Sequence, residues 1–423
     1  MHYIAFNPRQ PLEAADSLSD AEAAMPVPGP RDLLVAVRAA GVNPLDLKVR
    51  AGLVGVPEAV QSLGWDSAGI VTAVGSEVQW FEPGQAVYYA GSFDRSGAFA
   101  QYHLVDERLA GRMPAGLDFA QAAALPLAAL TAWQLLFERF ALEPGKRTAQ
   151  GSLLVLGGAG GVGSLLLQLA RQLTGLTVIA TASRPDSAAW CSDMGAHHVI
   201  DHGRPLLLQL AALGLAPVTH VAALSHTAQH MPALVELMAP HGKLGVIDDH
   251  AHFDAAPLKS KSISLHWEMV FTRPLHGTPD MQAQQHILGK VARLLEHGVL
   301  RTTLQRRIDG ISAAALRSAL QDLEQGGAVG KTVLVAQRSG WTVSQRNDRC
   351  TCQRQADTGH IGPGRRHAVN QPQPAQRGGD IDRAIGGVDA PAGRRVQSEQ
   401  PDKYQQAHGR RQQQPGAALV AQP

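Results

Sequence analysis

Apolar and polar residues alternate through the first quarter of the chain, and this alternation predicts β-strands. It is clearest over 32–43 and returns over 68–78, 84–91 and 97–107, where Gly or Pro bounds each stretch. A period of two places successive side chains on opposite faces of a strand. We therefore expect residues 1–110 to form a predominantly β domain.

The pattern becomes helical over 119–142 and then gives way to short apolar runs without alternation. Helix-length segments separate these runs, which lie at 152–158, 177–183, 197–201, 220–225 and 243–249. Continuous apolar strands between helices are typical of a parallel sheet that is covered on both faces. The sequence therefore predicts an α/β fold, in which a doubly wound parallel sheet follows the β-rich domain.

The composition of the chain changes near residue 338. Residues 338–423 are rich in Arg, Gln, Gly and Pro and carry a net charge of +6, which leaves −4 on residues 1–337. Such a composition buries too little apolar surface to offset a chain entropy of about 1 to 2 kcal/mol per residue. We expect a basic, low-complexity and disordered tail.

A glycine pattern marks a nucleotide site. Gly158, Gly160 and Gly163 fill the G-x-G-x-x-G pattern directly after one apolar strand and at the start of a helical segment, with Gly161 and Val162 inside it. Glycines at these positions let backbone N–H groups approach a pyrophosphate at the positive end of the helix. The motif predicts binding of a dinucleotide.

The end of the next strand bears on which dinucleotide binds. An NAD site usually has Asp or Glu about 20 residues after the glycines, where it accepts hydrogen bonds from the ribose. This strand ends instead with Ser183 and Arg184, whose hydroxyl and guanidinium suit a 2′-phosphate and favour NADPH. Asp186 nearby weakens this interpretation, and Arg184 as a solvated surface residue is the alternative.

Several motifs in order resemble the medium-chain dehydrogenase/reductase superfamily. They are "GVNPLDLKVR", "LGWDSAGIVTAVGSEVQWFEPGQAVYYAG", "AAALPLAALTAW" and "GGAGGVGSLLLQLA", and the resemblance covers residues 1–337. It implies a GroES-like catalytic domain over 1–125, completed by 272–337, and a Rossmann domain over 126–271.

The zinc enzymes of this superfamily place a Cys where this chain has Asn43 and a His where it has Trp65. Catalytic zinc needs about three protein ligands, and Asp66 alone cannot hold the ion. The chain is therefore more similar to the zinc-independent quinone oxidoreductase branch, and most of all to its members called zinc-type alcohol dehydrogenase-like proteins. No metal site is expected.

Four residues are candidates for the catalytic cleft, namely Asn43, Asp46, Lys48 and Thr131. Without a metal, oxygen charge that develops during hydride transfer must meet hydrogen-bond donors, and Asn43, Lys48 and Thr131 offer them. The resemblance implies that Asn43 and Thr131 line the cleft. In the alternative interpretation Asn43 and Pro44 form a turn, and Asp46 pairs structurally with Lys48 or Arg50.

Later loops add candidates for cofactor binding. Ser225, His226 and Asp248 follow strands of the predicted parallel sheet, and ligands bind outside the carboxyl ends of such strands. We expect these residues to contact the nicotinamide ribose. His226 could also act as a general acid, although a histidine at a loop tip is more often solvated.

These features predict an NADPH-dependent oxidoreductase that transfers hydride to a quinone or an α,β-unsaturated carbonyl without a catalytic metal. Two alternatives are a zinc-dependent alcohol dehydrogenase and a nonenzymatic NADPH-binding scaffold with a nucleic-acid-binding tail. The start of the chain has no secretory pattern and no window is apolar enough for a membrane span, so we expect a cytoplasmic protein that does not act at a membrane. The partner is a small molecule, nucleic acid is not expected, and the resemblance implies a homodimer.

Overall fold

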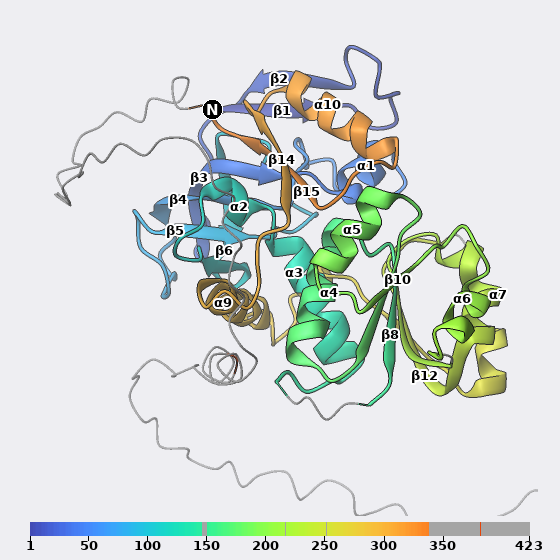
Figure 1. Ribbon diagram of the computed structural model, residues 1–423. Helices are drawn as coiled ribbons and strands as arrows, with labels where there is room; N and C mark the ends of the chain where they lie inside the picture. Colours follow the sequence, from blue (N-terminus) through green and yellow to red (C-terminus); the bar gives the residue numbers. More distant parts are fainter. Residues whose placement is uncertain (146–149, 216, 251, 338–380, 382–423) are drawn as a thin grey trace, which may run out of the picture. The chain divides into compact units, whose positions relative to one another are not determined.

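The computed structural model describes residues 1–145, 150–215, 217–250 and 252–337, together with Ile381. Two large β-sheets dominate this part of the chain (Figure 1). The predicted disordered tail over 338–423 lies outside the described residues apart from Ile381, whose side chain is buried.

The first sheet has seven strands in a mostly antiparallel arrangement. Its order is β14–β15–β3–β4–β5–β7, and β6 pairs with β3. The strands are β3 (Asp32–Gly41), β4 (Ser67–Val74), β5 (Ala86–Tyr89), β6 (Tyr102–Asp106), β7 (Ala110–Arg112), β14 (Leu304–Asp309) and β15 (Lys331–Val335). Because β15 pairs antiparallel with β3, residues after the parallel sheet complete the domain that the first residues begin. A separate hairpin-like pair joins β1 (His2–Phe6) and β2 (Leu18–Glu22).

The second sheet has six strands, and every neighbouring pair in it is parallel. The strands are β8 (Ser152–Leu156), β9 (Thr177–Thr181), β10 (His198–Ile200), β11 (Val218–Ala223), β12 (Met238–Val246) and β13 (Ser264–Trp267). Their order is β10–β9–β8–β11–β12–β13, so the chain reverses its direction of travel between β8 and β11. Ligands of such sheets bind outside the carboxyl ends of the strands at this switch point.

Helices cover both sheets. They are α1 (Pro44–Arg50), α2 (Phe119–Ala123), α3 (Pro126–Trp133), α4 (Gly161–Leu173), α5 (Pro185–Asp193), α6 (Leu206–Ala212), α7 (Thr227–Leu237), α8 (Thr272–His276), α9 (Ala283–Glu296) and α10 (Ala313–Glu324). Short 3-10 turns occur at η1 (Glu107–Leu109) and η3 (Ala256–Lys261), and α3 continues into a π-helical segment, η2 (Gln134–Arg139). Helix α3 is almost wholly buried and packs against α4 and α9, so it joins the two halves of the largest apolar core.

The predicted α/β class, with a β-rich domain and a doubly wound parallel sheet, is confirmed. No helix was predicted after Asn43, where the structure has helix α1. The helix begins there because Pro44 occupies its first turn, where a missing N–H costs nothing. The Asp46 carboxylate then accepts a hydrogen bond from the Asn43 backbone N–H at 2.7 Å.

Candidate functional site

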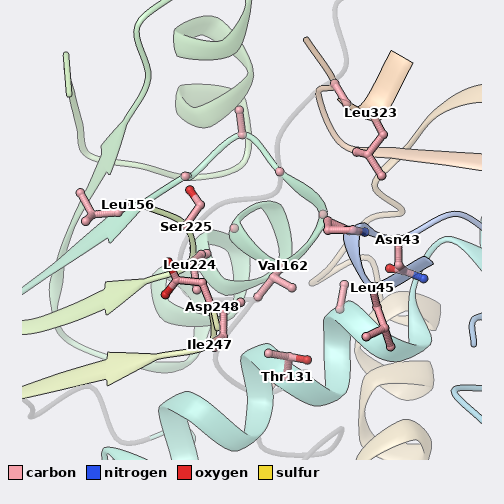
Figure 2. A pocket seen from close by; sticks show the side chains of 18 of the residues that line it. Asn43, Leu45, Thr131, Leu156, Val162, Leu224, Ser225, Ile247, Asp248 and Leu323 are labelled. Atoms are coloured by element: carbon pink, nitrogen blue, oxygen red, sulfur yellow. The ribbon is translucent and has the colours of Figure 1, made fainter. Parts of the chain in front are cut away.

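A cavity of about 820 Å³ lies where the carboxyl ends of the parallel strands face the β-rich domain. Figure 2 shows Leu224, Ser225, Ile247 and Asp248 on one side of it and Asn43, Leu45 and Leu323 on the other. Thr131 on α3 lies between the two groups, near Val162. The cavity therefore begins at the switch point of the parallel sheet and extends to the polar residues that come after β3.

The glycine motif forms the turn between β8 and α4. The preceding Gly157 has a φ of 78°, which favours glycine, and a Cβ on Gly163 would lie 2.5 Å from the Gly157 carbonyl oxygen. A Cβ on Gly160, by contrast, would meet no atom closer than 3.6 Å. Gly163 thus permits close packing of helix and loop, whereas Gly160 leaves open space beside the start of α4. This arrangement fits the pyrophosphate of a dinucleotide.

Ser183 and Arg184 are exposed residues between β9 and α5, and both line the cavity. The Arg184 guanidinium donates hydrogen bonds to the backbone carbonyls of Gly326 and Gly327 at 3.1 and 3.0 Å. Arg184 therefore connects the end of β9 to the loop after α10, and two of its N–H groups are already used.

Ser225, His226 and Asp248 also line the cavity, as their positions after β11 and β12 predict. His226 has a φ of 55° and precedes α7 with its side chain exposed. The Asp248 carboxylate accepts hydrogen bonds from the backbone N–H and the hydroxyl of Thr227, and it lies 3.1 Å from His250 Nε2. Asp248 thus fixes the start of α7 at the edge of the cavity.

A buried polar network forms the floor of the cavity on the side of the β-rich domain. Lys331 Nζ donates hydrogen bonds to the Val42 carbonyl at 2.9 Å, to Asn43 Oδ1 at 2.5 Å and to Asp66 Oδ2 at 2.8 Å. Asn43 Nδ2 donates to the same Asp66 oxygen at 3.1 Å, while Asp66 Oδ1 accepts the Leu127 backbone N–H at 2.8 Å. All three side chains are buried, and an ammonium with three acceptors has no donor left over. We call Asn43, Asp66 and Lys331 the floor network.

Sequence reasoning missed Lys331. It lies at the start of β15, 265 residues after Asp66, and only the pairing of β15 with β3 brings it to the cleft. A lysine that begins an otherwise apolar strand is a weak signal, because most such residues are solvated. Its burial could not have been inferred without knowing that β15 is the neighbour of β3.

Asp46 is fully buried and lies behind the cavity, which it does not line. Its two oxygens accept the backbone N–H groups of Asn43 and Gly64 at 2.7 and 2.9 Å. Burial raises the pKa of Asp46 to about 7, and the two N–H groups and the Lys331 charge offset only part of this rise. Asp46 therefore holds the start of α1 in place and does not pair with Lys48 or Arg50.

Lys48 and Thr131 both line the cavity. Lys48 Nζ lies 2.7 Å from Asp249 Oδ2, an ion pair that runs from α1 to the loop after β12. The Thr131 hydroxyl donates to the Leu127 carbonyl at 2.8 Å within α3. The structure thus brings Asn43, Lys48 and Thr131 to one cavity and leaves Asp46 outside it.

A glycine-rich turn at the switch point of a doubly wound sheet, with a cavity beside it, is typical of a protein that binds a dinucleotide. Comparisons with known proteins agree. Residues 29–115 match the alcohol dehydrogenase GroES-like domain, and residues 194–334 match the zinc-binding dehydrogenase family. The chain belongs to the medium-chain dehydrogenase/reductase superfamily.

Two curated relatives extend over most of this chain. A zinc-type alcohol dehydrogenase-like protein of Staphylococcus aureus is 35% identical over 79% of this chain and 99% of its own. A quinone oxidoreductase of Pseudomonas aeruginosa is 31% identical over 73% of this chain and 92% of its own.

Two solved structures are similar as well. A candidate zinc-dependent alcohol dehydrogenase from Rhizobium etli CFN 42 is 47% identical, with a TM-score of 0.75 over 79% of this chain and 98% of its own. A mycobacterial protein in complex with NADPH is 26% identical, with a TM-score of 0.67 over 79% of this chain and 99% of its own. The predicted family is thereby confirmed.

The name of the matching family suggests a zinc ion. The residues of the floor network do not fit one. The oxygens of Asn43 and Asp66 already accept hydrogen bonds from the Lys331 ammonium, which a zinc ion at the same oxygens would have to displace. Trp65 has no ligand atom to offer and donates its indole N–H to the Ser92 carbonyl at 3.1 Å. Within the described part of the chain, no group of three or more His, Cys, Asp or Glu residues is arranged to hold a metal. Over the same residues, no helix is both long and apolar enough to cross a membrane.

Proposed function

We propose that the protein is an NADPH-dependent reductase that delivers hydride to a quinone or to the β-carbon of an α,β-unsaturated carbonyl, without a catalytic metal. The named quinone oxidoreductase relative supports the substrate class. The NADPH complex of a similar structure and the absence of an acidic residue at the end of β9 support the cofactor.

The floor network is the observation that carries the metal-free part of the proposal. Lys331 supplies a positive charge to Asn43 and Asp66, the two floor residues with ligand oxygens. A buried carboxylate and ammonium stabilise each other only when their remaining hydrogen bonds are satisfied, and here they are. A zinc ion would have to displace the ammonium and would then find too few ligands.

In this proposal each candidate residue has a distinct task. The nicotinamide supplies the hydride, and the turn from Gly158 to Gly163 holds the pyrophosphate. Thr131 and Lys48 line the cavity. The Lys48 ammonium has N–H groups besides the one directed at Asp249, and the Thr131 hydroxyl would rotate away from the Leu127 carbonyl to donate to the substrate oxygen, whose charge rises as hydride arrives. Asn43 and Asp46 position the start of α1, so that Lys48 reaches the cavity.

The remaining cofactor contacts are proposed for the opposite wall. Ser225, His226 and Asp248 would contact the nicotinamide ribose, and Ser183 and Arg184 the adenosine ribose. We also propose that the protein is a cytoplasmic homodimer, and light scattering can check the dimer. We further propose a catalytic domain over 1–125 that is completed by 272–337, and a Rossmann domain over 126–271, which limited proteolysis can check.

The test is NADPH oxidation against a panel of quinones and enones, with primary and secondary alcohols plus NADP⁺ as the contrasting arm. We expect turnover with at least one quinone or enone and none with the alcohols. Alcohol oxidation without quinone or enone reduction would refute the proposed substrate class.

A further inference from the structure

One end of the cavity carries three histidines, of which the proposed reaction uses none as an acid or base. His202 follows β10, His226 precedes α7, and His230 lies one turn inside α7; all three line the cavity. The ring centroids of His202 and His230 are 6.3 Å apart, at an interplanar angle of 77°. His226 is exposed and the other two are half-buried, so solvent and ligands can reach them. We call these residues the histidine cluster.

The histidine cluster lies next to the expected ribose site. Strand β10 pairs in parallel with β9, so His202 leaves the sheet beside Ser183 and Arg184. In dinucleotide-binding folds, the residues after this second strand meet the 2′-hydroxyl or 2′-phosphate of the adenosine ribose. Two N–H groups of Arg184 already donate to backbone carbonyls, so Arg184 has fewer N–H groups left for a phosphate. A phosphate at this position would need further hydrogen-bond donors.

The chemistry of the histidine cluster fits an anion. Within the described residues no group of three or more potential ligands is arranged to hold a metal, which argues against a cation site. Imidazole N–H groups donate hydrogen bonds and become positively charged when protonated. His202 Nδ1 is buried and has no hydrogen-bond partner within the protein. No hydrogen bond within the protein would be lost if the His202 ring turned this nitrogen toward a bound anion.

The carboxylates nearest to the histidine cluster are already engaged. Asp201 forms an ion pair with Arg204 at 3.4 Å and accepts the Gly203 backbone N–H at 2.8 Å. Asp248 is bound to Thr227. These contacts reduce the competition between the carboxylates and an incoming anion.

The other elements around the histidine cluster add few charges. Helix α6, which packs against α7, has only Leu, Gln and Ala residues. His250 is paired with the engaged Asp248, and Asp186 lies in the first turn of α5. Two further cations line the cavity, and both are already paired: Lys48 with Asp249, and Lys331 with Asp66.

We propose that His202 and His230 bind the 2′-phosphate of NADPH together with Arg184, and that the two imidazole rings take up protons as it binds, while His226 keeps the contact with the nicotinamide ribose that is proposed above. The inference rests on the proposed function, since it assigns a discriminating site to the proposed cofactor. Phosphate oxygens accept imidazole N–H groups, and the dianion favours the charged form of each ring.

In the free protein, a lowered pKa of His230 leaves this ring able to take up a proton when the anion binds. Partial burial lowers the pKa of His230, and the neighbouring His202 and His226 lower it further, because three positive charges repel one another. The His230 ring is therefore mostly neutral near pH 7 before the anion arrives. Binding of a dianion favours the charged form of this ring and raises its pKa, so a proton is taken up.

Isothermal titration calorimetry with NADPH and with NADH tests the inference, because the two ligands differ only in the 2′-phosphate. Titrations run between pH 7 and 8, where a phosphate monoester is already largely dianionic and proton uptake reports on the protein. In buffers of different ionisation enthalpy, we expect net proton uptake with NADPH and none with NADH. NADPH affinity should fall several-fold across this pH range.

Variants identify the residues responsible. His202→Gln and His230→Gln should each lower NADPH affinity about tenfold and reduce the proton uptake, while NADH affinity stays unchanged. Unchanged NADH binding also shows that a variant is folded. His286→Gln, on the exposed surface of α9 outside the cavity, is the matched control and should bind both ligands like the wild type.

Two outcomes overturn the inference. One is NADPH binding without proton uptake; the other is the same NADPH affinity in the wild type and both cluster variants. The proposed function fails separately, if NADPH binds as expected here but reduces no quinone or enone. Because binding is measured by heat, neither result depends on turnover.

Discussion

The two ends of the cavity differ in how far the protein satisfies its own polar groups. In the floor network Asp66 is fully buried, and Asn43 and Lys331 are each 4% exposed, with every donor of the ammonium in use. At the other end, the histidine cluster is exposed or half-buried, and His202 has an unpartnered ring nitrogen. A network whose polar groups are all hydrogen-bonded within the protein stabilises the local structure. Polar groups without such partners can bind a ligand. The comparison separates a structural role from a binding role within one cavity.

Removal of the Lys331 charge should have the largest effect, and it tests whether the floor network has a structural role. Lys331→Met leaves the Asp66 carboxylate buried beside a neutral amide, and a broken buried pair costs about 3 to 5 kcal/mol of unfolding free energy. Urea unfolding of the variant measures this loss. Lys259→Met, an exposed lysine of η3, is the control and should change stability by about 0.5 kcal/mol or less.

A second variant makes the first one interpretable. In Lys331→Met with Asp66→Asn the uncompensated charge is gone, and we expect the double variant to recover part of the lost stability. Equal stability of Lys331→Met and the wild type would show that the floor network does not hold the fold.

The glycine turn offers a pair of variants that separates packing from ligand access. Gly163→Ala places a Cβ 2.5 Å from the Gly157 carbonyl oxygen and 2.6 Å from that of Gly158, so the loop must move away from α4. We expect a loss of about 1 to 3 kcal/mol in stability and at least tenfold in NADPH affinity. Thermal unfolding and calorimetry measure the two effects.

Gly160→Ala is the matched control for Gly163→Ala. Its Cβ has open space and its φ of −72° suits alanine, so stability should stay near that of the wild type. NADPH affinity should still fall, because the methyl group occupies space beside the predicted pyrophosphate site. If Gly160→Ala bound NADPH normally, the phosphate would not approach this part of the turn.

Asp46 provides a pH test of the region around the floor network. Its pKa is about 7 in the folded protein, against an ordinary value of 3.8 for an aspartate, so the folded state holds the proton more tightly than the unfolded chain does. The contribution of Asp46 to stability is therefore greatest at low pH and is lost as the pH rises toward 7. Relative to Asp46→Asn, the wild type should lose about 1 kcal/mol or more of stability between pH 5 and pH 8. A difference that is constant over this range would mean that Asp46 is already ionised at pH 5.

The smallest effect is expected for the ion pair between Lys48 and Asp249, because 32% and 67% of these side chains are exposed. A double-mutant cycle with Lys48→Met and Asp249→Asn should give a coupling energy of about 0.5 to 1 kcal/mol, which falls with added salt. Lys48→Met should also slow turnover, since the proposed donor is lost, whereas Asp249→Asn should not. Equal turnover in both variants would remove Lys48 from the proposed chemistry.

The sequence predicted best what depends on neighbours along the chain. The glycine motif, the parallel strands and the positions of Ser225 and Asp248 all follow from local patterns, and the structure brings them to one cavity. Helix α1 was missed because seven residues give too little periodicity to distinguish a helix from a loop.

Contacts between residues that are distant along the chain were also not predicted. The Lys331 contacts with Asn43 and Asp66 require strand pairing between distant segments, which no local pattern encodes. The same holds for the proximity of His202 and His230, whose separation along the chain gives no sign that their rings meet. Burial and charge balance at a site become visible only once the tertiary neighbours are known.

The central claim is that this cavity performs nicotinamide chemistry with an ammonium, and not a metal, at its floor. Its most direct test is the rate of NADPH-dependent quinone or enone reduction by chelator-treated protein, measured alongside its elemental zinc content. The account predicts an unchanged rate with far less than one zinc per chain, and no stimulation by added zinc. Loss of activity on chelation, with recovery at one zinc per chain, would contradict it.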